Sequence, residues 1–169
     1  MLKILVPVDG SRNSQFAVKH VIKEFMNNTA MEIHLLNVRT PFNQHIARFV
    51  SKQDRQSFHR AEGEKALAPV RQTLDNFSIP YSVHIEVGDR AKSITDTARR
   101  LRCDTIVMST ARKNSLTRLV EGSVVNKVLE LTSVPVEVIA GDSVSKLERY
   151  GIPAALAAVL AALLAAAVD

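Results

Sequence analysis

Two short polar segments, each directly after an apolar run, have the residue types of a small-ligand site. Asp9-Gly10-Ser11 follows the run from Lys3 to Val8, and Ser109-Thr110-Ala111 follows the run from Thr105 to Met108. A carboxylate, hydroxyl groups and small residues can together bind a polar ligand. The same residues can instead close a turn or cap a helix, and one residue can do both.

The residue types that most often catalyse reactions or bind metals are not grouped in this chain. Its five histidines are scattered, and no His-Asp-Ser set, Cys-His set or metal-ligand spacing connects them. The single cysteine, Cys103, excludes an internal disulfide and fits a reducing compartment, where such a thiol is usually a small buried hydrophobe. We therefore expect no catalytic residues and no metal ligands, and a protein that is not an enzyme.

The composition is that of one folded domain. The chain has 169 residues, of which 46% are hydrophobic and 23% charged, so it can bury a core. Its net charge of +5 permits acidic partners, but acidic residues are interspersed along it. The stretch with Arg48, Lys52, Arg55 and Arg60 is expected to be a solvated helix face, so nucleic acid is not an expected partner.

The first apolar run is strand-sized and has no cleavage pattern behind it, which predicts a cytoplasmic protein.

Strand-like and helix-like patterns alternate along the chain. Five short runs rich in β-branched residues are expected to be strands: Lys3 to Val8, Glu32 to Val38, Ser82 to Val87, Thr105 to Met108 and Val134 to Ile139. Four stretches between them have helical spacing, the second of them from about Arg48 to Leu74. Their expected inward residues are Ala17, Val21, Ile22 and Phe25; Phe58, Ala61, Ala66, Val70 and Leu74; Ile94, Ala98 and Leu101; and Val124, Val125, Val128 and Leu129.

This alternation predicts an α/β fold built from right-handed βαβ units. The expected structure has three layers, with a five-stranded parallel sheet of order 3-2-1-4-5 and helices on both faces, in one compact domain over residues 1 to 142. In that order the first and fourth strands are neighbours and their connections leave in opposite directions. Ligands of such sheets bind at that point, at the carboxyl ends of the strands. The topology therefore brings Asp9-Gly10-Ser11 and Ser109-Thr110-Ala111 together.

Several segments, taken in their order and spacing, resemble the universal stress protein family. These segments are Ile4 to Ser11, Val87-Gly88-Asp89, Cys103 to Met108, Leu119 to Val124 and Val134 to Val138. The resemblance spans nearly all of residues 2 to 140. It implies the nucleotide-binding α/β fold of that family, within the adenine-nucleotide α-hydrolase-like superfamily.

The phosphate-binding motif of that family is only partly present. ATP-binding members carry two glycines separated by two residues, then nine residues, then Gly followed by Ser or Thr. Gly122 and Ser123 match the end of this pattern, but Ser109 and Arg112 stand where the two glycines are expected. Serine is a mild change, whereas arginine costs about 1 kcal/mol if that position has a positive φ. A guanidinium is a good phosphate partner, so the loop either has lost tight ATP binding or uses Arg112 as a replacement ligand.

The resemblance also implies roles for residues at the strand ends. Asp9 corresponds to the family's adenine or ribose contact and Val38 to its apolar residue near adenine, although a turn aspartate and a core valine would look the same. Ser123 is either a phosphate ligand or a helix N-cap. The implied cofactor is ATP, with or without magnesium. Its candidate binding residues are Pro7, Val8, Asp9, Ser11, Val38, Met108, Ser109, Thr110, Arg112, Gly122, Ser123 and Val124.

The segment from residue 143 to 169 has no counterpart in the compact family fold. A polar linker is followed by an Ala/Leu run without polar residues from Ile152 to Val168, and Pro153 suits the first turn of a helix. A membrane-spanning helix needs about 20 apolar residues and alanine contributes little to insertion, so a membrane anchor is not favoured. We expect this C-terminal helix to pack on the domain or on a partner, or else to be poorly ordered.

The expected protein is a regulatory or binding module of the universal stress type, working as a homodimer. In that family the last strand pairs with its twofold mate, and Val136 to Ile139 resembles that edge. Two functions stay open: binding of ATP or another adenine nucleotide in a degenerate phosphate loop, and a nucleotide-independent interaction protein that acts as a homodimeric scaffold or regulator. A slow ATP hydrolase with Asp9 as its base is the least favoured.

Overall fold

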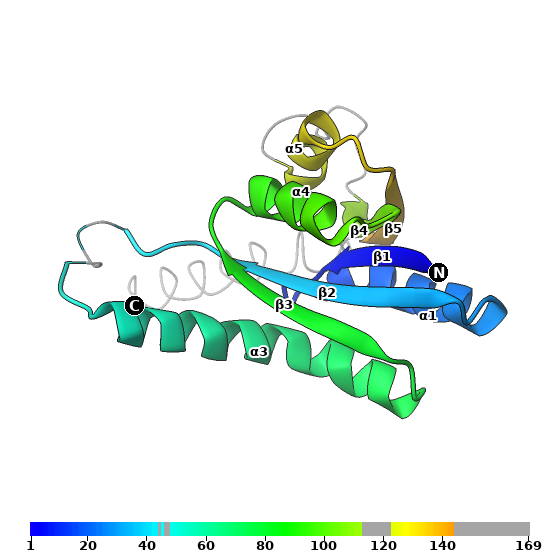
Figure 1. Ribbon diagram of the computed structural model, residues 1–169, viewed down its shortest axis with the longest axis horizontal. Coiled ribbons are helices and arrows are strands. Elements are labelled where there is room, and N and C mark those ends of the chain that lie inside the picture. Colours follow the sequence, from blue (N-terminus) through cyan, green and yellow to red (C-terminus); the bar gives the residue numbers. More distant parts are fainter. Residues whose placement is uncertain (44, 46–47, 113–122, 144–169) are drawn as a thin grey trace, which may run out of the picture.

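The computed structural model describes residues 1–43, 45, 48–112 and 123–143, which form a five-stranded parallel sheet with helices (Figure 1). The strands are β1 (Leu2–Pro7), β2 (Met31–Arg39), β3 (Tyr81–Val87), β4 (Thr105–Arg112) and β5 (Val136–Ser143). The helices are α1 (Ser14–Asn27), α3 (Lys52–Asn76), α4 (Arg90–Leu101) and α5 (Val124–Leu131). The sheet order is β3-β2-β1-β4-β5, and every neighbouring pair is parallel. The predicted α/β fold and strand order are confirmed.

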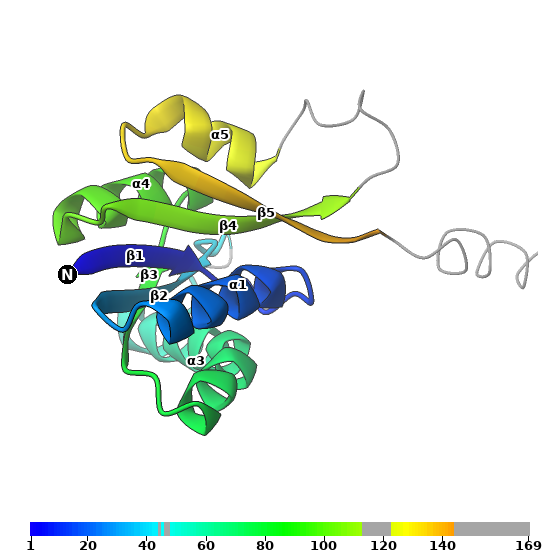
Figure 2. The ribbon, with the colours of Figure 1, turned by 90° about the vertical axis from the view of Figure 1, so that its right-hand side faces the viewer.

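The sheet is the middle of three layers. Figure 2 shows α4 and α5 on one side of it and α1 and α3 on the other. Successive side chains of a strand point to opposite faces, so Val6 joins the core under α1 and α3 while its neighbour Leu5 joins the core under α4 and α5. Both residues are fully buried. Burial on both faces explains the near-continuous apolar sequence of β1.

Helix α3 begins later than the sequence predicts, and its buried stripe agrees with the prediction only toward its C-terminal end, at Val70 and Leu74. Ser51 caps it, because its side-chain oxygen accepts a hydrogen bond from the backbone N–H of Asp54. Its buried residues are His59, Gly63, Leu67, Val70 and Leu74. The prediction that Phe58 and Ala61 point inward is wrong: Phe58 is 49% exposed and Ala61 is also exposed. The actual stripe contains a histidine and a glycine, which hydrophobic periodicity does not count.

Strands β4 and β5 extend beyond their apolar runs. The predicted ends are Met108 and Ile139, but the two strands continue as partners to Arg112 and Ser143, with a register irregularity after Thr110. Apart from Thr110, the added residues have weak strand propensity, so the pairing of the two backbones accounts for the extension.

The described helices include none that is long and apolar enough to cross a membrane. The predicted Ala/Leu helix at 152–168 lies outside the described residues.

Candidate functional site

Strands β1 and β4 separate before their carboxyl ends. They pair only at Ile4 with Thr105 and at Leu5 with Ile106. Farther along, Val6 and Pro7 of β1 are paired with β2, whereas β4 continues beside β5. The two backbones therefore diverge at the topological switch point, where open α/β sheets bind their ligands.

Asp9 lies at this point, in the turn after β1. Its Oδ1 atom accepts a hydrogen bond of 2.9 Å from the backbone N–H of Ser11, and the residue is exposed. Burial of part of the group works against its charge, but hydrogen bonds from the side chain and backbone of Ser11, and from Ser14, outweigh it and hold the pKa of Asp9 below its usual value. Asp9 is thus a turn residue whose ionised carboxylate can also accept a hydrogen bond from a ligand.

The glycine after Asp9 fixes the path of this turn. Gly10 has a φ of +81°, and a Cβ there would lie 3.2 Å from the Cβ of Ala66 in α3. A residue with a side chain would be both strained and crowded at this position. The close packing of α3 against the turn therefore holds Asp9 in place.

Ser109 makes a structural contact of its own. Its hydroxyl donates to the carbonyl oxygen of Asn13, at 2.5 Å, and so joins β4 to the residue before α1. The β5 strand also approaches this place, since a Cβ on Gly141 would lie 2.5 Å from Asn13 Oδ1 and 2.9 Å from the Thr110 carbonyl oxygen. The start of α1 is thus held against both β4 and β5.

The segment that replaces the two glycines of the family motif is a strand. Ser109, Thr110 and Arg112 are paired with β5, with a register irregularity between Thr110 and Arg112. Because Arg112 ends a strand, it does not need the left-handed conformation for which a penalty was expected. A paired strand also does not gather its N–H groups around an anion as a tight glycine turn does. The side chain of Arg112, and Gly122 with the rest of residues 113–122, lie outside what the structure describes.

The other predicted residues fall into two groups. Pro7, Val38, Thr110, Ser123 and Val124 are half-buried around the carboxyl ends of the strands and the start of α5. Ser123 occupies the N-cap position of α5, but its side chain forms no capping hydrogen bond. Val8 and Met108 are buried core residues, so their side chains pack inside the domain.

The sequence reasoning missed Asn37, at the end of β2. Its side chain is 1% exposed and donates through Nδ2 to the Val8 carbonyl oxygen, at 2.6 Å, while Oδ1 is buried without a hydrogen-bond partner. This contact connects the ends of β1 and β2 just before Asp9. A polar residue inside the apolar run from Leu35 to Val38 was the signal that could have identified it.

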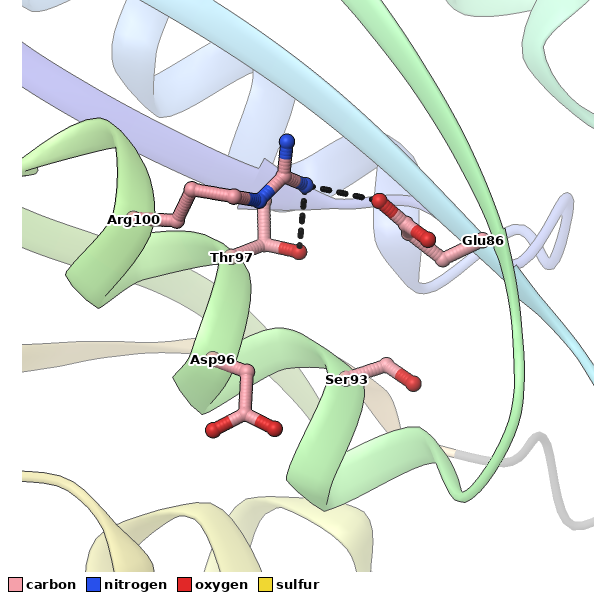
Figure 3. Close-up of a pocket in the computed structure, with 5 residues that line it drawn as sticks. All are labelled: Glu86, Ser93, Asp96, Thr97 and Arg100. Atoms are coloured by element: carbon pink, nitrogen blue, oxygen red, sulfur yellow. Dashed lines mark hydrogen bonds and ion pairs between the residues drawn. The ribbon is translucent and has the colours of Figure 1, made fainter.

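A separate polar pocket lies between β3 and α4, on the far side of β2 from the point where β1 and β4 diverge (Figure 3). It has a volume of about 170 Å³ and is lined by Glu86, Ser93, Asp96, Thr97 and Arg100. Arg100 and Glu86 form an ion pair of 2.7 Å across it. The pocket contains none of the residues predicted for nucleotide binding, so we place the candidate site at the divergence of β1 and β4.

A parallel sheet of this order, covered on both faces and carrying an acidic turn at its switch point, defines a doubly wound α/β domain, a class of fold whose ligands bind at that point. The model of the universal stress protein family matches residues 1–140. The chain therefore belongs to that family.

Individual relatives agree with this assignment. A curated relative, universal stress protein MJ0531 of Methanocaldococcus jannaschii, is 29% identical over 143 residues, which are 81% of each chain. The solved structure of hypothetical protein MJ0577 is 27% identical, with a TM-score of 0.63 over 82% of this chain and 94% of that one. A universal stress protein family protein from Arabidopsis thaliana, solved with AMP bound, is 19% identical, with a TM-score of 0.60 over 83% of this chain and 92% of that one.

Proposed function

We propose that this protein is a regulatory module that binds an adenine nucleotide where β1 and β4 diverge. The observation that carries the proposal is the ionised, exposed Asp9 at that switch point. The carboxylate would accept hydrogen bonds from the ribose or the adenine amino group. The AMP-bound Arabidopsis thaliana protein of the same fold supports the choice of ligand class.

We expect the affinity for phosphate-rich nucleotides to be low. The strand pairing of Ser109, Thr110 and Arg112 with β5 gives a different backbone from a glycine cradle. Phosphate contacts would then depend on the Arg112 guanidinium and on residues 113–122. Helix α5 begins with Val124, shortly after these residues in the sequence, and its N-terminus would add a favourable partial charge.

Equilibrium dialysis of the full chain against millimolar ATP or AMP, with and without magnesium, tests the proposal. We expect measurable retention that falls at least about tenfold in Asp9→Ala, the effect of roughly one charge-assisted hydrogen bond. Asp89→Ala is the matched control, because Asp89 also lies just after a strand but caps α4 instead. No retained nucleotide, or equal losses in both variants, would reject the site.

Restoring the two glycines of the family motif tests whether Ser109 and Arg112 weaken or support ATP binding. In the Ser109→Gly/Arg112→Gly variant, a gain of ATP affinity would mean that the native loop lacks tight phosphate binding. A loss would identify Arg112 as a replacement ligand, as its guanidinium chemistry allows.

A second candidate function is nucleotide-independent interaction, with the protein acting as a homodimeric scaffold or regulator. The strand-like Ser109–Arg112 segment and the Ser109–Asn13 contact favour it, because both use motif positions for structure. This function predicts no nucleotide retention in the dialysis experiment and unchanged binding after the glycines are restored. A slow ATP hydrolase is less favoured. If ATP turnover is unchanged in Asp9→Ala, then Asp9 is not the general base of such a reaction.

A further inference from the structure

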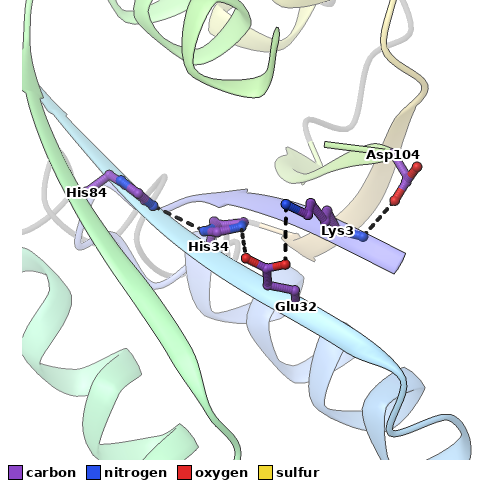
Figure 4. A network of polar contacts seen from close by, with 5 residues as sticks. All are labelled: Lys3, Glu32, His34, His84 and Asp104. Atoms are coloured by element: carbon purple, nitrogen blue, oxygen red, sulfur yellow. Dashed lines mark hydrogen bonds and ion pairs between the residues drawn. The ribbon is translucent and has the colours of Figure 1, made fainter. Parts of the chain in front are cut away.

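Two histidines meet on the side of the sheet that faces α4 (Figure 4). His34 of β2 and His84 of β3 lie on adjacent strands, and the Nδ1 atom of His34 is 3.1 Å from the Nε2 atom of His84. Their ring centroids are 5.2 Å apart. His34 is only 5% exposed, while His84 is half-buried. This contact lies several residues before the carboxyl edge and is separate from the proposed nucleotide site.

Charged residues of β1 and β2 surround His34 on the side away from His84. Its Nε2 atom is 3.1 Å from Oε1 of Glu32, close enough for an ion pair, although Nε2 forms no aligned hydrogen bond. The other carboxylate oxygen of Glu32 is 3.4 Å from Nζ of Lys3. The backbone N–H of Lys3 donates to Asp104 at 2.7 Å.

Charged residues of β3 and α4 lie on the His84 side. Glu86, on the same face of β3 two residues farther along, pairs with Arg100 of α4 at 2.7 Å. The same guanidinium is 3.5 Å from the hydroxyl of Thr97, and Asp96 lies on the same pocket wall. Arg100 of α4 therefore places a positive charge near His84, and Glu86 places a negative charge near the same ring.

The contact between the two rings needs one N–H and one lone pair. A neutral pair has such an arrangement, and so does a pair that has gained one proton. When both rings are fully protonated, an N–H of each ring points at the other across 3.1 Å. The hydrogen bond is then lost, and two positive charges meet where one ring is 5% exposed.

We propose that the His34–His84 contact is a proton-sensitive connection that holds the edge strand β3 to β2 at neutral pH and separates when both rings are protonated. Strand β3 is at the edge of the sheet, and within the described part of the chain β2 is its strand partner. Its face toward α4 is polar and has the open pocket of Figure 3 beside it. Loss of the contact would therefore loosen β3 and its contact with α4 before the central strands.

The expected titration agrees with this geometry. Burial lowers the pKa of His84 below its usual value of 6.5, and His34 and Arg100 add to the effect, while Glu86 opposes it. Between the folded-state pKa and 6.5, the unfolded chain thus binds more protons at His84 than the folded chain does. The contribution to stability is complete above about pH 6.5 and is lost as the pH falls through the folded-state pKa of His84.

Hydrogen exchange of backbone amides tests the proposal on the full chain. Rates are corrected for the intrinsic pH dependence of exchange and compared at pH 7.5 and pH 5. We expect the amides of β3 to exchange about tenfold faster at the lower pH, because loss of the contact between the rings raises the population of the open edge strand. The amides of β1 should change far less. Unchanged protection of β3 between the two pH values would overturn the proposal.

His84→Gln assigns the response to this residue. The glutamine amide can either donate a hydrogen bond to Nδ1 of His34 or accept one from it, so it can replace Nε2 of His84 whichever ring carries the proton, but it does not titrate in this range. We expect the acid response of β3 to fall below about twofold. His20→Gln is the control, because His20 contacts Glu137, at 2.8 Å, on the opposite face, and should keep the wild-type response. A wild-type response in His84→Gln, or its loss in His20→Gln, would contradict the assignment.

An NMR titration of the wild-type histidine rings decides the question even if His84→Gln does not fold. We expect His84 to titrate below pH 6.5, and we expect the ring signals of His34 to respond when the contact between the two rings changes. A His84 midpoint at or above 6.5, or a titration of one ring without any response of the other, would overturn the proposal.

Discussion

At Ser109 a single hydroxyl group connects β4 to the start of α1. The sequence marks this residue only as a replacement for a family glycine, a mild change for a phosphate loop. The structure gives Ser109 a structural role, since its hydroxyl donates a hydrogen bond to the carbonyl oxygen of Asn13, which lies 96 positions earlier in the sequence. The residue therefore contributes to the shape of the site whether or not a nucleotide binds there.

Ser109→Ala should destabilise the fold. Removing the hydroxyl leaves the half-buried Asn13 carbonyl oxygen without this donor, at a cost of about 1 kcal/mol in the free energy of unfolding. Denaturant unfolding of both proteins measures the difference. Ser57→Ala, at an exposed position of α3, is the comparison, and an equal loss there would mean that the Asn13 contact does not contribute specifically to stability.

Cys103 is buried, as the sequence predicts. The residue is 7% exposed, and burial raises the pKa of its thiol to about 11, with Lys3 opposing and Asp104 and Glu32 adding to the shift. The thiolate is the reactive form, so almost none is present at pH 8.

A disulfide reagent should therefore label Cys103 at pH 8 at least about a hundredfold more slowly in the native protein than in urea, because both burial and the raised pKa limit the reaction. Absorbance of the released thiol follows the reaction. Rapid labelling of one thiol per native chain would show that this part of the core opens readily.

At the scale of elements, α3 is positioned by close backbone contacts. A Cβ on Gly63 would lie 2.7 Å from Cγ2 of Ile85 in β3, and the turn at Gly10 packs against Ala66. The helix can approach the sheet this closely because both contacts involve a glycine. Periodicity alone gave Phe58 and Ala61 as inward residues, since it counts apolar side chains and gives no weight to a glycine that allows contact.

Gly63→Ala tests this packing. Alanine favours a helix by up to about 1 kcal/mol, but its methyl group would overlap the side chain of Ile85, so we expect a net destabilisation of about 1–3 kcal/mol. In an Ile85→Ala background the overlap is absent, and the same substitution should be neutral or stabilising. Unfolding of the four proteins of this double-mutant cycle gives the coupling. Equal effects of Gly63→Ala in both backgrounds would contradict the packing argument.

At the scale of the whole molecule, the two edge strands of the sheet differ in how well they are suited to pair with a second copy of the chain. Strand β5 forms one edge and presents Val138, which is 40% exposed, while β3 forms the other and presents Val87, which is 47% exposed. We propose, as the sequence resemblance implied, that the β5 edge forms a homodimer through residues 136–139. The polar face of β3 toward α4 is less suited to that role.

Val138→Arg should convert a dimer to a monomer, because a charge in a paired, apolar edge is unpartnered and desolvated. Val87→Arg is the matched control on the opposite edge and should leave the mass unchanged. Light scattering after gel filtration measures both. A monomeric wild-type protein, or dissociation caused by Val87→Arg alone, would reject the β5 dimer.

The sequence by itself determined the alternation of strands and helices, the sheet order and the place of Asp9, because these depend on local periodicity and on the general handedness of βαβ connections. It also placed Asp9 and Ser109 at one edge of the sheet. Only the tertiary structure decided the extension of β4 through Arg112, the Ser109–Asn13 contact and the meeting of His34 with His84. Each of these contacts joins groups that are distant in sequence. Local sequence patterns do not predict which donor and which acceptor form a hydrogen bond after the elements have packed together.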